Sequence, residues 1–169
     1  MHSPRVSSRG NIRHLHSVQD VLRWIQIKGE CMMQLSPYLF FNDGLCREAM
    51  TTYADILGGE PGMVVAAGDM PPEFPIDEDK KSWLAHFEVN FPEGKLMGSD
   101  SLVGPSEPMA GANVMLNFET KEAAETAFNR LAEGGEVTMP FAATFWSAGF
   151  GMLTDRYGVR WMLGCEEAP

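Results

Sequence analysis

The sequence predicts an α+β protein built from paired βαβββ modules. Two observations indicate this class. Segments with the periodicity of strands and helices follow the order strand, helix and about three strands, and this order occurs twice along the chain. Each predicted helix stops at a glycine pair, Gly58-Gly59 in the first half and Gly134-Gly135 in the second. A length of 169 residues suits one domain, or two small halves with a common core.

The first module is predicted over residues 34–103. The helix carries an apolar face formed by Ala49, Met50, Tyr53, Ile56 and Leu57. The segment between the second and third strands holds three prolines and six charges, which indicates an exposed loop at 71–81. The elements are a strand, a helix and three more strands, at residues 34–42, 46–57, 62–70, 83–91 and 95–102.

The second module is predicted over residues 110–166, after a connector that contains Pro105 and Pro108. Thr120 is the expected N-cap of its helix. Asp155 is expected to hold the last hairpin turn, with Gly158 free to adopt a positive φ. The expected elements are a strand at 111–118, a helix from 121 that Gly134-Gly135 ends, and strands at 136–139, roughly 147–154 and 159–165.

Two such modules cannot each bury both faces of a sheet. Pairing them buries the faces beside the helices and leaves a cupped inner surface, where a small ligand would sit. Strand alternation assigns to the core Leu39, Phe41, Phe87, Val89, Leu116, Phe118 and Leu163.

Residues 1–33 are interpreted as an extension outside the fold. They hold five basic and two acidic residues, a net of +3, whereas residues 34–169 hold eight basic and 21 acidic residues, a net of −13. A short amphipathic helix at 18–27 and an organellar transit peptide are two interpretations. The favoured one is a start assigned too early, with the natural chain beginning at Met32 or Met33.

Composition excludes several classes of function. A formal charge of −10 lacks the basic face that phosphate binding needs, so no nucleic-acid partner is expected. No apolar run reaches the roughly 18 residues of a membrane span, so no membrane partner is expected. Three scattered cysteines form neither a disulfide framework nor a metal-ligand spacing, which favours the cytoplasm.

Three segments resemble PhnB-like proteins of the vicinal oxygen chelate superfamily, which includes glyoxalase I, bleomycin resistance proteins and dioxygenases. They are LSPYLFFNDGLCREAMTTYADILGGE, LMGSDS and TFWSAGFGMLTDRYGVRWML, and the resemblance runs from about Gln34 to Gly164. It implies the paired βαβββ fold and a homodimer. Some members carry the label 3-demethylubiquinone-9 3-methyltransferase. A glycine-rich loop that opens a helix after a strand, as an S-adenosylmethionine site would need, is absent from the sequence.

The resemblance also locates the positions of the superfamily's divalent metal. Its His and Glu ligands would fall near Tyr38, at Ser99 or Asp100, near Asn113 and at Met162. Most of these side chains are not usual ligands of a hard cation. No metal or cofactor is therefore expected, and a metal-dependent enzyme remains the alternative.

The expected cavity mixes aromatic, amide and charged side chains, as a site for a small polar or aromatic ligand would. Phe145 and Trp146 have a second interpretation, as core or as a dimer contact. The candidates are Tyr38, Phe40, His86, Glu88, Ser99, Asp100, Asn113, Met115, Asn117, Phe145, Trp146, Arg160 and Met162.

His86, Glu88 and Asp100 are the catalytic candidates. His86 and Glu88 lie about 7 Å apart along one strand face, as a general base and its neighbour would, or as residues of a solvated face would. Asp100 either accepts a hydrogen bond from a ligand or caps the end of its strand. Cys46 opens a helix, a position that can lower the pKa of a thiol, although no histidine is near it in the sequence.

Three functions remain open at this point. The first is an enzyme of the glyoxalase or dioxygenase type, which needs a metal. The second, which is favoured, is a small-molecule binding protein without a metal, whose acidic body attracts cationic ligands at long range. The third is an interaction module in which residues 1–33 recruit a partner.

Overall fold

The computed structural model describes residues 33–168. The chain divides into two units, residues 1–35 and 36–169, and the second unit holds the elements named below. The helix expected at 18–27, and with it the question of what residues 1–32 do, lies outside the described residues.

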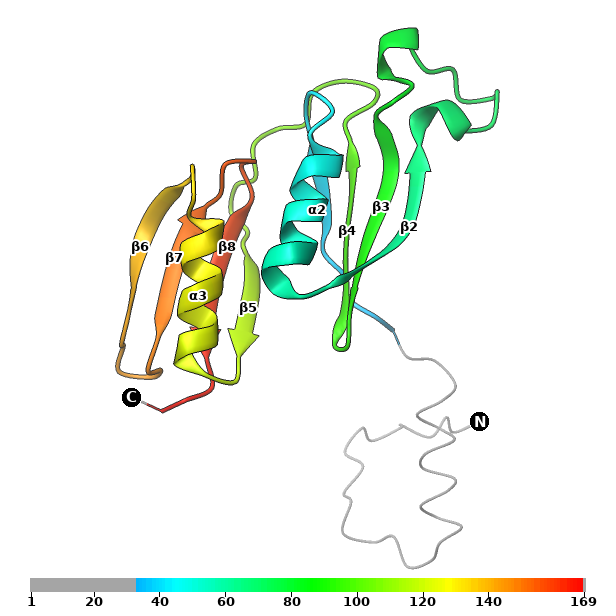
Figure 1. Cartoon of the computed structure of the whole chain (residues 1–169). Helices are drawn as coiled ribbons and strands as arrows, with labels where there is room; N and C mark the ends of the chain where they lie inside the picture. Colours follow the sequence, from blue (N-terminus) through cyan, green and yellow to red (C-terminus); the bar gives the residue numbers. More distant parts are fainter. Residues whose placement is uncertain (1–32, 169) are drawn as a thin grey trace, which may run out of the picture. The chain divides into compact units, whose positions relative to one another are not determined.

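Module one forms a four-stranded sheet with one helix lying on it (Figure 1). The strand order is β1-β4-β3-β2, in which β1 runs parallel to β4 and the other neighbours are antiparallel. The elements are β1 (Tyr38–Phe41), α2 (Cys46–Leu57), β2 (Glu60–Ala66), β3 (Leu84–Phe91) and β4 (Gly94–Asp100), with 3-10 turns at Ala67–Asp69 and Glu78–Lys80.

Module two has the same plan (Figure 1). Its sheet has the order β5-β8-β7-β6, again with its first strand parallel to its last. The elements are β5 (Val114–Phe118), α3 (Lys121–Leu131), β6 (Glu136–Ala142), β7 (Phe150–Thr154) and β8 (Arg160–Cys165). The predicted α+β class with two βαβββ modules is confirmed.

At two strands the last residue differs by three or more positions from the prediction, each time for a local reason. The strand expected at 62–70 ends at Ala66, because the chain turns at Ala67–Asp69 and the Ala67 N–H donates to the carbonyl of Trp83. The strand expected at 136–139 continues to Ala142 through Pro140. β6 is an edge strand, where a proline that lacks an N–H is tolerated.

The two helices begin in different ways. Thr120 accepts a hydrogen bond from the Ala123 N–H at 3.3 Å, as expected of an N-cap. Leu45, at the corresponding position of α2, makes no such bond, and the Cys46 N–H donates instead to Asp100 of β4 at 2.9 Å. The start of α2 is therefore tied to a strand that lies 54 residues further along the chain.

Each sheet has one face against its helix and one face away from it. The face away from the helix is the one expected to form the cupped inner surface of the paired modules, and it is here called the outer face of its sheet. A Cβ on Gly98 would lie 3.3 Å from Met50 of α2, and a Cβ on Gly151 would lie 2.7 Å from Phe128 of α3, so these positions face the helices. All seven residues assigned to the core belong to it or pack against it. The neighbouring residues in each strand therefore form the outer faces.

A buried carboxylate joins the two modules. Asp155, in the turn between β7 and β8, accepts from the Tyr53 hydroxyl of α2 at 2.6 Å and from the Trp161 indole at 2.8 Å. Its other oxygen accepts from the backbone N–H groups of Tyr157 and Val159. Burial and the charge of Asp155 raise the pKa of Tyr53. Asp155 thus holds the hairpin turn, as expected, and also ties it to α2.

No helix among residues 33–168 is long and apolar enough to cross a membrane.

Candidate functional site

The outer face of module one places aromatic and charged side chains side by side. Tyr38 of β1, Met97 of β4 and Glu88 of β3 pair in register across three strands. Tyr38 and Phe40 are exposed at 39% and 61%, and their ring centroids are 5.3 Å apart. An antiparallel face exposed to water normally carries polar residues, so two exposed rings on one strand mark this face as a candidate site.

Four side chains form a connected polar chain on this face, here called the Tyr38–Lys95 chain. The Tyr38 hydroxyl lies 3.1 Å from Nδ1 of His86, and Nε2 of His86 lies 3.4 Å from one carboxylate oxygen of Glu88. Nζ of Lys95 lies 2.9 Å from the other oxygen. The hydrogen bonds from Lys95 and His86 lower the pKa of Glu88. The structure therefore brings two of the catalytic candidates, His86 and Glu88, into contact.

The chain uses both ring nitrogens of His86. When Glu88 is ionised and the imidazole is neutral, the tautomer with its proton on Nε2 faces the carboxylate, and Nδ1 then accepts from the Tyr38 hydroxyl. An imidazole engaged on both sides has no free nitrogen to take a proton from a ligand. This geometry suits His86 to orient Tyr38, whose oxygen keeps lone pairs available to a ligand.

The outer face of module two is dominated by methionine. Met139 pairs with Met152, Met152 with Met162, and Met162 with Met115, so one methionine from each strand stands in a single row across the sheet. We call this the methionine row. Met115 is 48% exposed. The row contains two residues, Met139 and Met152, that sequence reasoning did not select.

Two further rows flank the methionines. On one side Arg160 pairs with Thr154, which pairs with Glu136. On the other side Gly164 pairs with Asn117 and with Phe150. The predicted residues Met115, Asn117, Arg160 and Met162 therefore share one face, as expected from alternation.

Asp100 is placed on the opposite side of its sheet from the other candidates. It is 3% exposed, pairs with Phe41 on the helix side, and accepts from the backbone N–H groups of Cys46 and Leu84 at 2.9 and 2.7 Å. Both oxygens are engaged, so Asp100 has the capping role and does not reach the outer face.

Burial, followed by the charge of Asp100, raises the pKa of the Cys46 thiol to about 12, which removes Cys46 as a nucleophile.

The remaining candidates lie at the margins of these faces. Ser99 belongs to the outer face of β4 but is buried. Asn113 precedes β5 and is half-buried. Phe145 and Trp146 lie in the loop before β7, where Trp146 is 53% exposed and its ring centroid is 5.8 Å from that of Phe150. Trp146 therefore stands beside the outer face of module two.

The side chains at the superfamily's metal positions do not fit a divalent ion. Tyr38 is bonded to His86, Asp100 is on the other side of the sheet, and Met162 offers a thioether. Among residues 33–168, no three His, Cys, Asp or Glu side chains are placed to hold a metal together.

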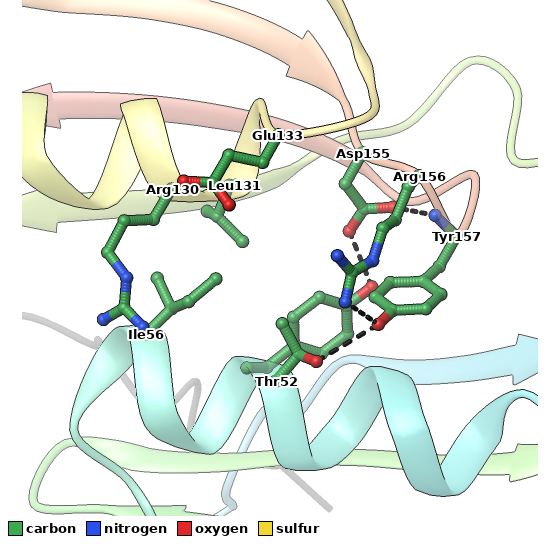
Figure 2. Close-up of a pocket in the computed structure, with 9 residues that line it drawn as sticks. Thr52, Ile56, Arg130, Leu131, Glu133, Asp155, Arg156 and Tyr157 are labelled. Atoms are coloured by element: carbon green, nitrogen blue, oxygen red, sulfur yellow. Dashed lines mark hydrogen bonds between the residues drawn. The ribbon is translucent and has the colours of Figure 1, made fainter.

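A small cavity that the sequence did not predict lies between the modules on their helix side. It has a volume of about 140 Å³ and contains Arg130 of α3 and Arg156 of the β7–β8 turn (Figure 2). Both guanidinium groups are neutralised, Arg130 by Asp55 and Arg156 by Glu48. It is lined by Thr52, Tyr53, Ile56, Arg130, Leu131, Glu133, Asp155, Arg156 and Tyr157.

The polar groups of this cavity hold the two modules together. The Tyr157 hydroxyl lies 3.1 Å from that of Thr52 (Figure 2). It also donates to Glu48 at 2.8 Å, so the β7–β8 turn is bound to α2. With both guanidinium groups and its hydroxyls already paired, this cavity belongs to the joint between modules and is a weaker candidate than the outer faces.

The repeated sheet order and the uncovered outer faces place this chain in the class of proteins built from paired βαβββ modules. The chain belongs to the Glyoxalase/Bleomycin resistance protein/Dioxygenase superfamily, whose family model matches residues 37–163. Protein YjdN of Escherichia coli (strain K12) is 31% identical over 139 residues, which cover 78% of this chain and 94% of that protein.

Two solved structures extend this likeness. Protein PA1353 from Pseudomonas aeruginosa is 44% identical with a TM-score of 0.73, over 80% of this chain and 98% of that one. A protein from Bacillus cereus, described as "Putative 3-demethylubiquinone-9 3-methyltransferase, PhnB protein", is 25% identical with a TM-score of 0.66, over 79% of this chain and 99% of that one. The resemblance to PhnB-like proteins is confirmed.

Proposed function

We propose that this protein binds a small organic molecule on the outer faces of its sheets, without a resident metal or cofactor. The observation that carries the proposal is the contrast between the two faces of each sheet. The helix sides are filled by one continuous core, whereas the outer faces leave aromatic rings and thioethers open beside ordered polar groups. Ligand sites in proteins combine these features.

Module one supplies the fixed polar part of the proposed site. The Tyr38 hydroxyl is held by His86, which is held in turn by Glu88 and Lys95. A hydroxyl that is already oriented loses little freedom when a ligand binds to it. Phe40 adds an exposed ring next to this hydroxyl, which suits a ligand with a flat or apolar part.

We propose that a second copy of the chain closes the site. One copy leaves Phe40, Met115 and Trp146 open to water, and exposed apolar side chains on neighbouring surfaces favour association. The proposed partners are therefore the small molecule and a second copy. Cys46 and Cys165 are free, which supports a reducing compartment such as the cytoplasm.

A metal-dependent glyoxalase or dioxygenase is not proposed, because the donor atoms described above do not converge. A methyltransferase is not proposed either. That activity is named in the description of the Bacillus cereus protein and in the label that some family members carry, and the sequence lacks the loop that the methyl donor would need.

Native mass spectrometry of freshly purified protein tests the proposal. We expect a dimer that carries a small organic molecule, and we expect Phe40→Ala to lose that molecule while Val103→Ala, a change at a fully exposed loop residue, keeps it. A stoichiometric divalent ion, together with an activity that chelation abolishes, would instead establish the enzyme alternative. A monomer without ligand, which no small molecule stabilises against heat, would exclude the binding proposal.

A further inference from the structure

We infer that the outer face of module two takes a flat organic anion, with its carboxylate on Arg160 and its apolar body on the methionine row. This inference rests on the proposed binding function and adds the chemical class of the ligand that this second face takes, apart from the face that carries Tyr38 and Phe40. It depends on two independent features of the face, one apolar and one charged.

The methionine row provides an adaptable apolar floor. Methionine side chains are unbranched and polarisable, and their sulfur atoms make favourable contacts with aromatic rings. Because cross-strand neighbours in a sheet have Cβ atoms about 5 Å apart, the four side chains form a continuous strip. A strip of this kind can adjust to a planar molecule.

Gly164 lets the methionine row extend toward Phe150. Gly164 stands between Asn117 and Phe150, and a Cβ there would lie 3.1 Å from the terminal methyl of Met115 and 3.5 Å from both flanking side chains. The missing side chain therefore allows the Met115 methyl to lie over Gly164, which widens the apolar strip on this side of the row. Trp146 stacks edge-on against Phe150 at the margin of the strip.

Arg160 supplies a positive charge on the other side of the row. It is half-buried, and its position two residues before Met162 in β8 puts both side chains on one face. Among residues 33–168, none of the ion pairs or side-chain hydrogen bonds involves its guanidinium group. Lys95, on the outer face of module one, is by contrast paired with Glu88.

A charged guanidinium group without a partner favours an oxyanion. Arginine stays ionised and presents donors that match the two oxygens of a carboxylate. Glu136, in the same row and separated from Arg160 by Thr154, is exposed and forms no ion pair with it.

The acidic body does not cancel this local attraction. The screening length at physiological ionic strength is about 8 Å, so distant carboxylates weigh less than a cation in contact with the ligand. At this face the contact with Arg160 is therefore expected to outweigh the long-range attraction of the acidic body for cationic ligands.

Tryptophan fluorescence titrations with three probes test the inference. The probes are 1-naphthoate, naphthalene-1-carboxamide and 1-naphthylmethylammonium, which share one ring system and differ in charge. We expect the carboxylate to bind about tenfold more tightly than the amide, and the ammonium to bind most weakly. Arg160→Gln should remove this preference without changing the affinity for the amide, and Arg47→Gln, at an exposed arginine of α2, should leave the preference intact.

A second pair of variants tests the apolar floor. Met162→Thr should weaken all three probes by a similar factor, whereas Met63→Thr, at an exposed methionine of β2, should weaken none. Circular dichroism checks that each variant is folded.

Equal binding of carboxylate and amide, or no effect of Arg160→Gln, would overturn the inferred ligand class and leave the proposed function standing. Failure of all three probes to bind would also overturn it, and native mass spectrometry would then judge the binding function separately. If Met162→Thr changes the molar mass in light scattering without changing probe affinity, the row is a contact between copies and the inference is wrong.

Discussion

The outer faces of the two modules occupy the same place in the same fold and carry different chemistry. In module one, corresponding strands present Tyr38, Met97 and Glu88, with the glutamate locked into a polar chain. In module two they present the methionine row, with one arginine that has no ion-pair partner among residues 33–168. The duplicated backbone sets where the side chains stand. The residue types alone make the module-one face polar and held by hydrogen bonds, and the module-two face apolar and adaptable.

The modules also differ in how their helices are capped. Module one anchors α2 through Asp100, whereas module two caps α3 with the local Thr120. Asp155 then joins the two by accepting from Tyr53 in one module and Trp161 in the other. The faces differ in chemistry, but they depend on one shared buried carboxylate.

The largest effect is expected when that shared carboxylate is removed. Asp155→Ala leaves a buried hydroxyl, an indole N–H and two backbone N–H groups without their acceptor. We expect the free energy of unfolding to fall by roughly 3–5 kcal/mol, in one transition that takes both modules together. Urea denaturation followed by fluorescence measures it.

Asp55→Ala is the matched control, because Asp55 also bridges the modules but lies at the surface in an ion pair with Arg130. Its loss should cost about 1 kcal/mol or less. Two separate unfolding transitions for Asp155→Ala would show that the modules are less dependent on each other than this account requires.

Removing the cap of each helix should give the next largest loss in the free energy of unfolding. The loss should differ between the two modules. Asp100→Ala leaves the N–H groups of Cys46 and Leu84 buried without an acceptor, and we expect a loss of about 2–4 kcal/mol. Thr120→Ala removes one exposed cap and should cost about 1 kcal/mol. Equal losses in urea denaturation would contradict the difference in capping. Hydrogen exchange should show α2 opening first in Asp100→Ala and α3 first in Thr120→Ala.

The sequence predicted the fold because the signals that define it are local. Alternation identified residues 83–91 as a strand, Gly58 ended α2 as predicted, and Thr120 was recognised as a cap. The second glycine pair was a wrong prediction, because α3 ends at Leu131 with Ala132 as its C-cap. Alternation could also have excluded Asp100 from the outer face, since Ser99 and Asp100 are adjacent and must point to opposite sides.

The rest of the site depends on pairing between distant segments. The methionine row exists only because four strands meet in one register, and Met139 and Met152 have no local feature that marks them. The contact between His86 and Glu88 depends on side-chain rotamers, and the part played by Lys95 depends on the β3–β4 pairing. The contact of Asp155 with Tyr53 spans 102 residues.

The smallest expected effect is a change in melting temperature when the Tyr38–Lys95 chain is broken. It tests the contrast between the hydrogen-bonded face of module one and the adaptable methionine row of module two. Because its hydrogen bonds lower the pKa of Glu88 in the folded state, the ionised carboxylate stabilises the fold above its ordinary pKa. That contribution is lost as the pH falls through the lowered value. We therefore expect Glu88→Gln to reduce the melting temperature slightly near neutral pH, and the gap from wild type to close below about pH 4.

Melting curves between pH 3 and 7 measure this difference, with Glu60→Gln on the edge strand β2 as the control. A difference in melting temperature that stays constant across this pH range would show that the charge of Glu88 does not stabilise the Tyr38–Lys95 chain. The same variant releases Nε2 of His86 from its carboxylate and so loosens the hold on the Tyr38 hydroxyl. Glu88→Gln should therefore weaken a ligand that bonds Tyr38, while binding of 1-naphthoate beside Arg160 stays unchanged, because the two faces act through separate side chains.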